Sequence, residues 1–408
     1  MLRALFRSPS LRTAAAMGVG GLCFSAGGLL LARELPTQEY ARVSLVLGIV
    51  SVAGNIAPLG LDQVVGRRGL RLNGRWRRAS LAASVTTALA AALLGGLLYH
   101  LSLALMASVA LITLTLGVAL SIGAHFQGQR RFGIGVWVLQ LLNGTIALSA
   151  GITVALGLDT AAEVCGLMAM VGAAAAAAAW WILSRERDVQ GRQLSPWTAR
   201  GEAFSLATMQ AGNSTLLQLE RLLLEPTVGL HDLATYGVLA VFVSSPFRLL
   251  QSAVQFTLIP RLREAHDAKA RRALMLREGL LVAVPLAAGS AAIWLFAPPL
   301  AHWLLAGRYD LGKALIAVVL VSGWLKLVSG FLTAVVVSRG EERRLRWLSA
   351  ICWVSLGVSV AGAFAAIPWG FVGVLGGIAA GWLLRCLLTG WHAFACLKES
   401  RAPHLVMT

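Results

Sequence analysis

The residues whose types and spacing could do chemistry lie on two neighbouring apolar segments, 203–224 and 234–259. Four polar side chains of the first segment recur at helical spacing and share one helix face. They are Gln210, Ser214, Gln218 and Arg221. Three residues of the second segment recur in the same way, and these are Arg248, Gln251 and Gln255. A charged side chain in hydrocarbon costs about 2.5–3.5 kcal/mol, so both faces are expected to look into a protein interior or a wet cavity.

Guanidinium and amide groups are suited to binding anions and hydroxyl groups. The guanidinium fork holds phosphate oxygens in pairs, and a glutamine amide offers both a donor and an acceptor. We therefore predict a substrate cavity that receives an anionic or sugar-like molecule. Its predicted residues are Arg248, Arg221, Lys326, Gln210, Gln218, Gln251 and Gln255. The alternative interpretation of these faces is a polar helix–helix contact or a helix end near the membrane interface.

The composition identifies an all-α polytopic membrane protein. Of 408 residues, 57% are hydrophobic and 13% are charged, and long apolar runs recur from end to end. Runs of about 18 residues or more cross a bilayer as helices, whereas the residue alternation of an outer-membrane barrel is absent. Twelve spans are expected. They are 11–32, 43–66, 79–99, 101–123, 133–156, 162–183, 203–224, 234–259, 278–303, 312–337, 346–367 and 370–394.

The basic residues indicate the orientation of these spans. The formal net charge is +17, but the arginines and lysines form short clusters between spans, so they do not indicate nucleic-acid binding. Of the 35 Lys and Arg residues, 27 fall in the termini and one alternating set of loops, and four fall in the other set. Basic loops stay in the cytoplasm. Both termini are therefore expected in the cytoplasm, which requires an even number of spans.

Signs of catalysis or metal binding are absent from the sequence. The five cysteines show neither a CxxC motif nor another metal-like spacing. HExxH, GxSxG and P-loop spacings are also missing, and the segments between spans are too short for a soluble catalytic domain. We predict that the protein is not an enzyme and needs no metal or cofactor. Two further charged residues are expected outside the cavity: Arg385 as an interface anchor, and Asp62 as a partner of the arginines that follow it.

A weak internal repeat divides the chain into two halves. The segment 32–50, ARELPTQEYARVSLVLGIV, has a partner in 228–243, VGLHDLATYGVLAVFV, and each leads into a span that ends in arginines. Six spans per half keep the two halves in the same orientation, related by a pseudo-twofold axis along the membrane normal. The expected domains are a six-helix lobe over 1–200, with its cytoplasmic connector, and a second six-helix lobe over 201–408.

The chain resembles the Wzx-type oligosaccharide flippases of the multidrug/oligosaccharidyl-lipid/polysaccharide (MOP) exporter superfamily. The resemblance rests on the segment 32–50, on GLDQVVGRR at 60–68, and on three features of the second half. Those features are the charged end of the seventh span at Glu220–Arg221, the entry to the eighth span at Tyr236–Gly237, and its exit at Pro260–Arg261. One departure is Ala41–Arg42, where glycine often follows the preceding tyrosine in that family.

The resemblance implies alternating access between two lobes and a polyprenyl-diphosphate-linked oligosaccharide as substrate. The head group would move from the cytoplasmic to the outer leaflet of the bacterial inner membrane, during the synthesis of O-antigen, capsule or exopolysaccharide. Membrane lipid is an expected partner, glycan polymerase machinery is a further candidate, and a nucleic-acid partner is not expected. Because the cavity lies between two lobes of one chain, a functional monomer is expected.

Three other functions compete with this interpretation. The first is an ion-coupled small-molecule exporter of the multidrug type in the same superfamily, but such exporters tend to need carboxylates deep in the first lobe, and the first span has none. The second is a membrane-bound glycan polymerase or ligase, which usually carries a long catalytic outer loop. The third is a membrane scaffold without transport. Accumulation of lipid-linked glycan on the inner leaflet of a deletion strain would separate the flippase from all three.

Overall fold

The computed structural model describes residues 9–129, 131–185, 194–244, 247, 258, 261–262, 267–339 and 342–398. Over these ranges the chain forms helices joined by short turns, with no β-strand. The helices group into two compact units. Unit 1 comprises Met1–Val241 and Leu304–Arg308, and unit 2 comprises Phe242–Trp303 and Tyr309–Thr408.

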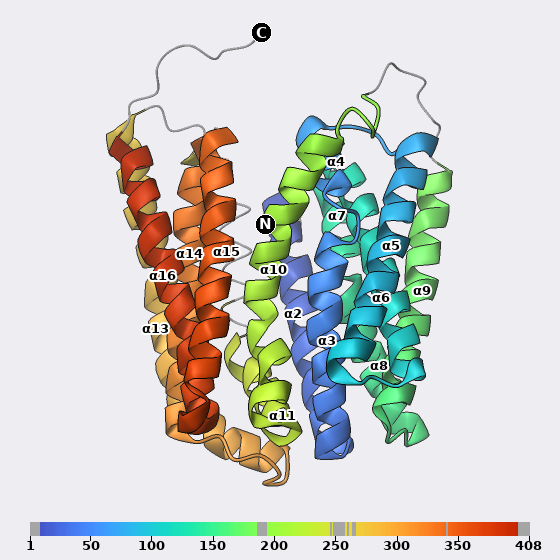
Figure 1. Cartoon of the computed structure of the whole chain (residues 1–408), viewed down its shortest axis with the longest axis vertical. Coiled ribbons are helices and arrows are strands. Elements are labelled where there is room, and N and C mark those ends of the chain that lie inside the picture. The colour runs from blue at the N-terminus through green and yellow to red at the C-terminus, as the bar shows by residue number, and fades with distance from the viewer. Residues whose placement is uncertain are drawn as a thin grey trace, which may run out of the picture. The chain divides into compact units, whose positions relative to one another are not determined.

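Unit 1 is a bundle of roughly aligned helices (Figure 1). Its helices are α2 (Pro9–Glu34), α3 (Thr37–Ile56), α4 (Leu61–Arg68), α5 (Gly74–Tyr99), α6 (Leu103–Gly128), α7 (Phe132–Leu139), α8 (Leu141–Leu156), α9 (Ala161–Ser184), α10 (Arg200–Val228) and α11 (Leu230–Leu239). Helix α6 packs against α5 and α9, α8 packs against α2, and α10 packs against α3. The segment Leu304–Arg308 joins this unit, where Arg308 Nη1 donates a 2.7 Å hydrogen bond to the Arg33 carbonyl.

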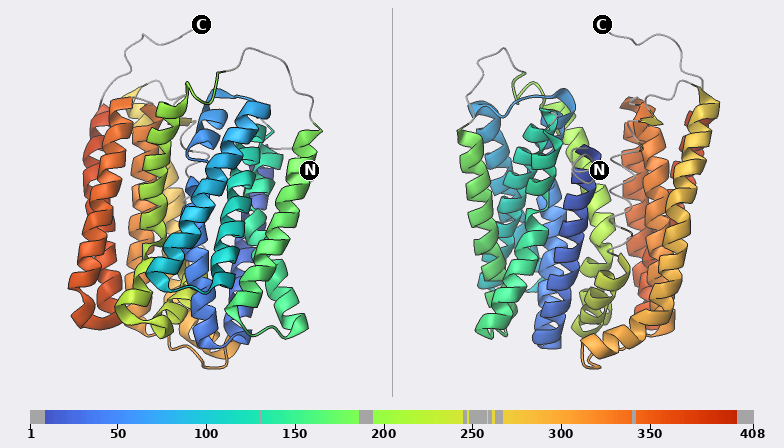
Figure 2. Two further views of the ribbon diagram at one scale, coloured as in Figure 1. Left: turned by 45° about the vertical axis from the view of Figure 1, so that its right-hand side comes forward. Right: turned by 180° about the vertical axis from the view of Figure 1, so that it is seen from behind.

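The described residues of unit 2 form four long helices, which Figure 2 shows from two further directions. They are α13 (Ala268–Leu304), α14 (Lys313–Arg339), α15 (Glu342–Ala365) and α16 (Gly370–Lys398), with the short 3-10 turn η2 (Ile367–Trp369) before α16. Helix α16 packs against both α14 and α15. Glycines allow α15 and α16 to approach closely, since a Cβ at Gly362 would lie 2.7 Å from the Gly377 carbonyl oxygen. Ser359 Oγ donates across the same contact to the Ile378 carbonyl at 3.0 Å.

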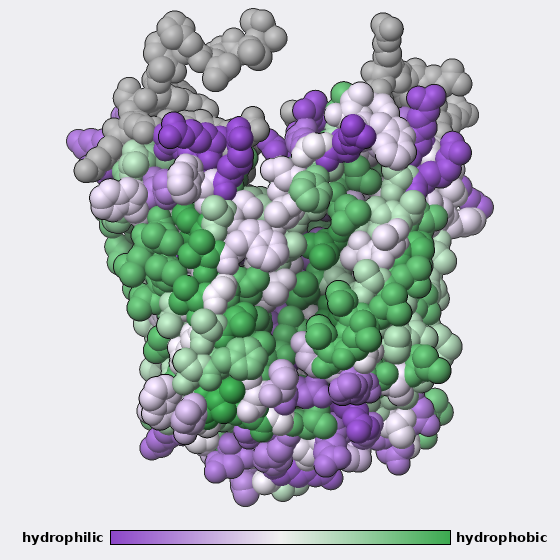
Figure 3. Space-filling model, viewed as in Figure 1, coloured by the Kyte–Doolittle hydropathy of each residue, from purple (hydrophilic) through white to green (hydrophobic). Residues whose placement is uncertain are grey.

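Most of these helices are long and apolar enough to cross a bilayer. In the described part of the chain nine helices meet that condition, or ten if the bent pair α7–α8 counts as one span. In the face shown in Figure 3, hydrophobic residues fill the middle of each unit and hydrophilic residues gather toward its ends. Helix α10 is not among the nine, although it is 29 residues long, because its polar face makes it less apolar. The prediction of an all-α polytopic membrane protein is confirmed.

Two predicted spans are broken in ways that hydropathy does not reveal. The second predicted span, 43–66, divides into α3 and α4. Between them Leu59 and Gly60 adopt left-handed backbone angles, with φ of 49° and 76°. A Cβ at Gly60 would also collide with the carbonyl oxygen of Ala203, so glycine permits both the turn and the contact between α4 and α10. The fifth predicted span, 133–156, bends by 46° between α7 and α8.

Side-chain caps fix where several helices begin. Asn73 Oδ1 accepts hydrogen bonds of 3.1 Å from the backbone N–H groups of Arg75 and Trp76, which starts α5. Thr160 and Glu163 form a capping box at the start of α9. These bonds satisfy backbone donors that lack a partner within the helix, so the chain turns sharply into each span.

The end of unit 1 that carries α4 and the start of α5 has a well-packed apolar core, the arginine-end core. It includes Val64 and Val65 of α4, Trp76 of α5 and Phe126 of α6, all buried. The indole N–H of Trp76 donates a 2.9 Å hydrogen bond to the Leu194 carbonyl. This bond links the start of α5 to the connector that leads into α10.

The boundary between the two units falls after Val241, so α10 and α11 pack with the first part of the chain. The sequence predicts lobes over 1–200 and 201–408. That division stays a prediction about the protein's functional lobes.

Candidate functional site

The predicted polar face of the seventh span lies on α10. Gln210 and Ser214 are consecutive on this face, and the Ser214 hydroxyl donates a 2.7 Å hydrogen bond to the Gln210 backbone carbonyl. Gln218 and Arg221 follow at helical spacing, and both are buried. The structure therefore brings Gln210, Gln218 and Arg221 together on one side of one helix of unit 1. Their contact with a substrate stays a prediction.

Arg221 is enclosed by two neighbouring helices of its own unit. It is 3% exposed, and its guanidinium carbon lies 5.8 Å from the ring centre of Phe24 on α2. On the other side is α3, where a Cβ added to Gly48 would lie 3.0 Å from the Cβ of Arg221. Glycine at position 48 therefore leaves room for the arginine stem. At this position the polar face makes the helix–helix contact that the alternative interpretation describes.

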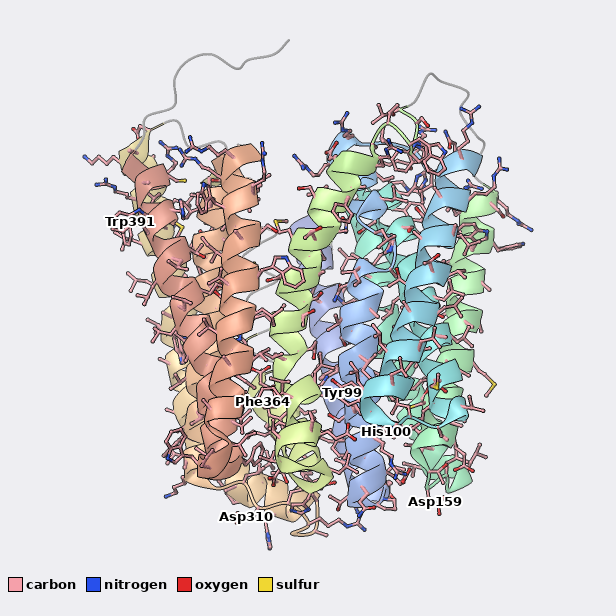
Figure 4. All side chains as sticks on the ribbon, in the orientation of Figure 1. Tyr99, His100, Asp159, Asp310, Phe364 and Trp391 are labelled. Atoms are coloured by element: carbon pink, nitrogen blue, oxygen red, sulfur yellow. The ribbon has the colours of Figure 1, made fainter. Side chains whose placement is uncertain are left out.

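The end of α10 beyond the predicted span is held by α5. Tyr99, the last residue of α5, donates from its hydroxyl to the Leu222 carbonyl at 3.0 Å (Figure 4). Glu225 lies one turn further along α10 and is half-buried. Burial raises the pKa of Glu225, while the nearby charges of Arg42 and His100 oppose that increase. A carboxylate and two basic groups thus gather where α10 leaves the apolar region.

Lys326 lies on α14 in unit 2 and shares an aromatic ring with a second cation. Its ammonium nitrogen lies 5.6 Å from the ring centre of Trp382 on α16. The guanidinium carbon of Arg385, also on α16, lies 5.1 Å from the same ring. Both distances are within the range of cation–π attraction. We call the two cations, Lys326 and Arg385, together with the ring that they share, the Trp382 cation pair.

Arg385 does not have the exposure expected of an interface anchor. An interface anchor extends its charge toward water, but Arg385 is only 5% exposed in the structure. The spacing of Trp382 and Arg385 by three residues on one helix could have indicated that they face the same neighbour. Helices α14 and α16 contain no aspartate or glutamate, so the positive charge that these two helices contribute is not balanced within their own sequences.

Three predicted cavity residues, Arg248, Gln251 and Gln255, lie outside the described residues. The residue before them, Phe247, is described and packs against α14. Its ring meets Trp324 edge-on, with ring centres 6.1 Å apart, and lies against Gly323. The start of this polar segment therefore contacts α14 two to three residues before Lys326.

Asp62 does not pair with the arginines that follow it. Arg67 and Arg68 reach Glu202 on α10, at 3.6 Å and 2.6 Å. Asp62 is buried, and within the described ranges its Oδ1 has no hydrogen-bond partner. The expectation of a local ion pair at Asp62 is wrong. Asp62 is buried after the break before α4, and Arg67 and Arg68 form their ion pairs with Glu202 instead.

The described residues include no group of three or more His, Cys, Asp or Glu side chains placed to hold a metal ion. The cysteines, of which four are buried, are all free thiols. The Trp382 cation pair and the residues Gln210, Ser214, Gln218 and Arg221 of α10 instead provide cations, amides and a hydroxyl, which are groups suited to binding anions and sugars.

Comparison with known proteins gives the fold. No protein-family model matches the chain, and no curated protein matches it. Among solved structures, an inward-facing multidrug resistance MATE family transporter of the MOP superfamily matches with a TM-score of 0.63 and 15% identity, over 96% of this chain and 100% of that one. The chain has the fold of the MOP-superfamily transporters.

Two further matches agree with the MOP fold. The lipid II flippase MurJ, in an inward closed conformation, matches with a TM-score of 0.63 and 10% identity, over 93% of this chain and 87% of that chain. An outward-facing MATE transporter matches with a TM-score of 0.58 and 14% identity, over 95% of this chain and 96% of that chain. The predicted fold class of twelve transmembrane helices in two six-helix lobes is confirmed by this MOP fold.

Proposed function

We propose that this protein flips a polyprenyl-diphosphate-linked oligosaccharide from the cytoplasmic to the outer leaflet of the bacterial inner membrane. It would act by alternating access, during the synthesis of a surface polysaccharide. The structural matches support a multi-pass membrane protein with a transporter or flippase fold. The charge and chemistry of the membrane helices support a lipid-linked oligosaccharide as the substrate.

The Trp382 cation pair is the observation that carries the proposal. Lys326 and Arg385 lie within apolar helices and contact the same Trp382 ring, which concentrates positive charge at one place in unit 2. Placing positive charge in the hydrocarbon region costs free energy, and a bound anionic substrate would offset part of that cost. A diphosphate supplies such an anion, and its oxygens match the guanidinium fork of Arg385.

The polar face of α10 supports the sugar part of the proposed substrate. Gln210 and Gln218 each have an amide donor and acceptor suited to hydroxyl groups. Arg221 stays a proposed cavity residue, although in this structure it packs against Phe24 of α2 and Gly48 of α3. A chain of hydroxyl groups loses its hydration on leaving water, so it needs such partners to cross the bilayer. We propose Arg248, Gln251 and Gln255 as further members of the cavity, because they recur at helical spacing on one face and carry a guanidinium and two amide groups.

The proposal is tested in cells by deleting the gene and locating the lipid-linked glycan. We expect the glycan to accumulate on the inner leaflet and surface polysaccharide to disappear, with both effects reversed by the wild-type gene. An Arg385→Gln protein at normal abundance should restore much less export than wild type. Unchanged glycan export in the deletion strain would contradict the proposed function.

The second candidate is ion-coupled export of small molecules, which is favoured by the similarity to MATE transporters. One structural neighbour is instead a lipid II flippase, so the fold is compatible with both activities. Ion-coupled exporters tend to need carboxylates deep in the first lobe, and the first span has none, whereas the proposed flippase site is cationic. The deletion strain separates them, because a drug exporter would change drug susceptibility without changing the leaflet distribution of the glycan.

The remaining features of the proposal follow from the sequence. We propose that the lobes 1–200 and 201–408 work as a functional monomer with both termini in the cytoplasm. Glycan polymerase machinery is a proposed partner, because a flipped oligosaccharide must be consumed on the outer face.

A further inference from the structure

A groove with basic residues along its border lies on unit 1, between the first turns of α5 and the segment 195–204 that leads into α10. It comprises two adjoining cavities of about 670 and 490 Å³. The cavities share Ala79 and Ala82 of α5 and Pro196 and Trp197 of the connector, so they form one continuous space. We call it the arginine-rimmed groove.

The floor of the groove is apolar and built from small residues. Ala79, Ala82 and Ala83 recur at helical spacing on one face of α5, which leaves room beside the helix. Ala203 closes the opposite side and belongs to the buried arginine-end core. The hydrogen bond from Trp76 to the Leu194 carbonyl holds α5 against the connector. The floor is therefore a fixed apolar surface.

Two large apolar side chains remain exposed along the groove. Trp197 is 78% exposed and Phe204 is 73% exposed. Tryptophan is enriched where membrane proteins meet the boundary between head groups and hydrocarbon. The exposed Trp197 and the arginines beside it are typical of that boundary, where the apolar floor of the groove would contact lipid. Hydrocarbon chains are therefore the natural occupants of its floor.

Three arginines border the same space, namely Arg75 and Arg78 of α5 and Arg200 at the start of α10. Neighbouring arginines have other partners: Arg67 and Arg68 pair with Glu202, and Arg77 donates to two backbone carbonyls. Within the described ranges, Arg75, Arg78 and Arg200 form no salt bridge with a carboxylate. The border of the groove therefore carries positive charge available to a lipid phosphate.

We infer that the arginine-rimmed groove binds one anionic glycerophospholipid of the adjoining leaflet. Its acyl chain lies over the alanines of α5, and its phosphate lies among the three arginines. The head group is small and lacks a glycan, because the described lining offers only Ser195 as a polar residue besides the arginines. A sugar-bearing lipid would need more hydrogen-bonding side chains than this. The inference is independent of the proposed function.

The test measures lipid binding to the purified full-length protein in detergent by native mass spectrometry. The probes are phosphatidylglycerol, phosphatidylcholine and a polyprenyl monophosphate, each added alone. We expect wild type to retain one phosphatidylglycerol molecule in preference to phosphatidylcholine. The triple variant Arg75→Gln/Arg78→Gln/Arg200→Gln should bind it roughly a hundredfold more weakly, because each basic residue near an anionic lipid contributes severalfold.

Two further variants make the result specific to the groove. Ala82→Trp keeps the arginines but fills the apolar floor, and it should also lose the bound lipid. The control triple variant Arg272→Gln/Arg277→Gln/Arg343→Gln removes the same charge from residues that do not line the groove, and it should bind as wild type does. An unchanged thermal unfolding midpoint for each variant shows that it is folded.

Several outcomes would overturn the inference. Equal retention of phosphatidylglycerol and phosphatidylcholine would show that the phosphate charge is not recognised. Equal loss in the control triple variant would indicate a general effect of net charge. Full binding by Ala82→Trp would exclude the groove as the site. Preferential retention of polyprenyl monophosphate over phosphatidylglycerol would assign the groove to a carrier lipid and refute the phospholipid.

Discussion

Substitution of Trp382 tests the contact between this ring and the two cations of unit 2. Lys326 and Arg385 lie 5.6 and 5.1 Å from its ring centre. A cation–π contact contributes about 1 kcal/mol when partly exposed and about 2 kcal/mol when desolvated. Lys326 is half-buried and Arg385 is buried, so the two contacts together should contribute about 3 kcal/mol. Trp382→Leu should lose all of this stabilisation.

The phenylalanine variant is the matched control. Trp382→Phe keeps an aromatic face toward both cations, although phenylalanine is a weaker partner than tryptophan. It also removes an indole N–H that has no hydrogen-bond partner within the described ranges, so no hydrogen bond is lost there. We therefore expect the Phe variant to be about 2 kcal/mol more stable than the Leu variant, as measured by equilibrium unfolding in mixed micelles.

A double-mutant cycle separates the cation contact from the loss of packing. In the Arg385→Met background, one of the two cations is absent, so Trp382→Leu should cost about 2 kcal/mol less than it does in wild type. Packing changes at Trp382 are common to both backgrounds and cancel to a first approximation. An equal cost of Trp382→Leu in the two backgrounds, or equal stability of the Phe and Leu variants, would refute the proposed stabilisation of these cations by the ring.

Three other predictions follow from the topology and the cavity. A reporter that is active only outside the cytoplasm should work when fused near Asp159 or Trp369 and stay silent near Arg75 or Arg192; activity at Arg75 would overturn the orientation. Arg248→Lys should keep part of glycan export because its charge survives, whereas Arg248→Glu should abolish export by repelling the diphosphate; normal export by Arg248→Glu at normal protein level would exclude Arg248 from the cavity. Co-expression of separately inactive cavity variants should not restore export, and restoration would contradict a functional monomer.

Hydropathy and charge were sufficient to predict the all-α membrane fold and most of the helices. Helix α10 is an example: the apolar segment 203–224, with polar residues at helical spacing on one face, was predicted as a span, and the structure forms a helix over it. The break between α3 and α4 was not predictable in the same way. It depends on left-handed angles at Leu59 and Gly60 and on the contact of Gly60 with Ala203, which is distant in sequence.

The candidate site was only partly predictable for a related reason. Spacing along one helix correctly grouped Gln210, Gln218 and Arg221 on one face of α10. Spacing does not show which neighbouring helix that face meets, so the positions of Phe24 and Gly48 beside Arg221 came from the structure. The pairing of Lys326 with Arg385 through Trp382 was missed because the residues come from two different helices.

Translocation of a lipid-linked oligosaccharide by the purified protein in liposomes is the most direct test of the proposed function. The measurement follows how much of a polyprenyl-diphosphate-linked oligosaccharide, placed in one leaflet, becomes accessible to a glycosidase on the other side. Wild type should transfer the oligosaccharide, and Lys326→Gln/Arg385→Gln should transfer much less while remaining folded and inserted. The Arg272→Gln/Arg277→Gln/Arg343→Gln variant should retain the wild-type rate. Transfer no faster than in protein-free liposomes would contradict the account, and so would equal transfer by wild type and the Lys326/Arg385 variant.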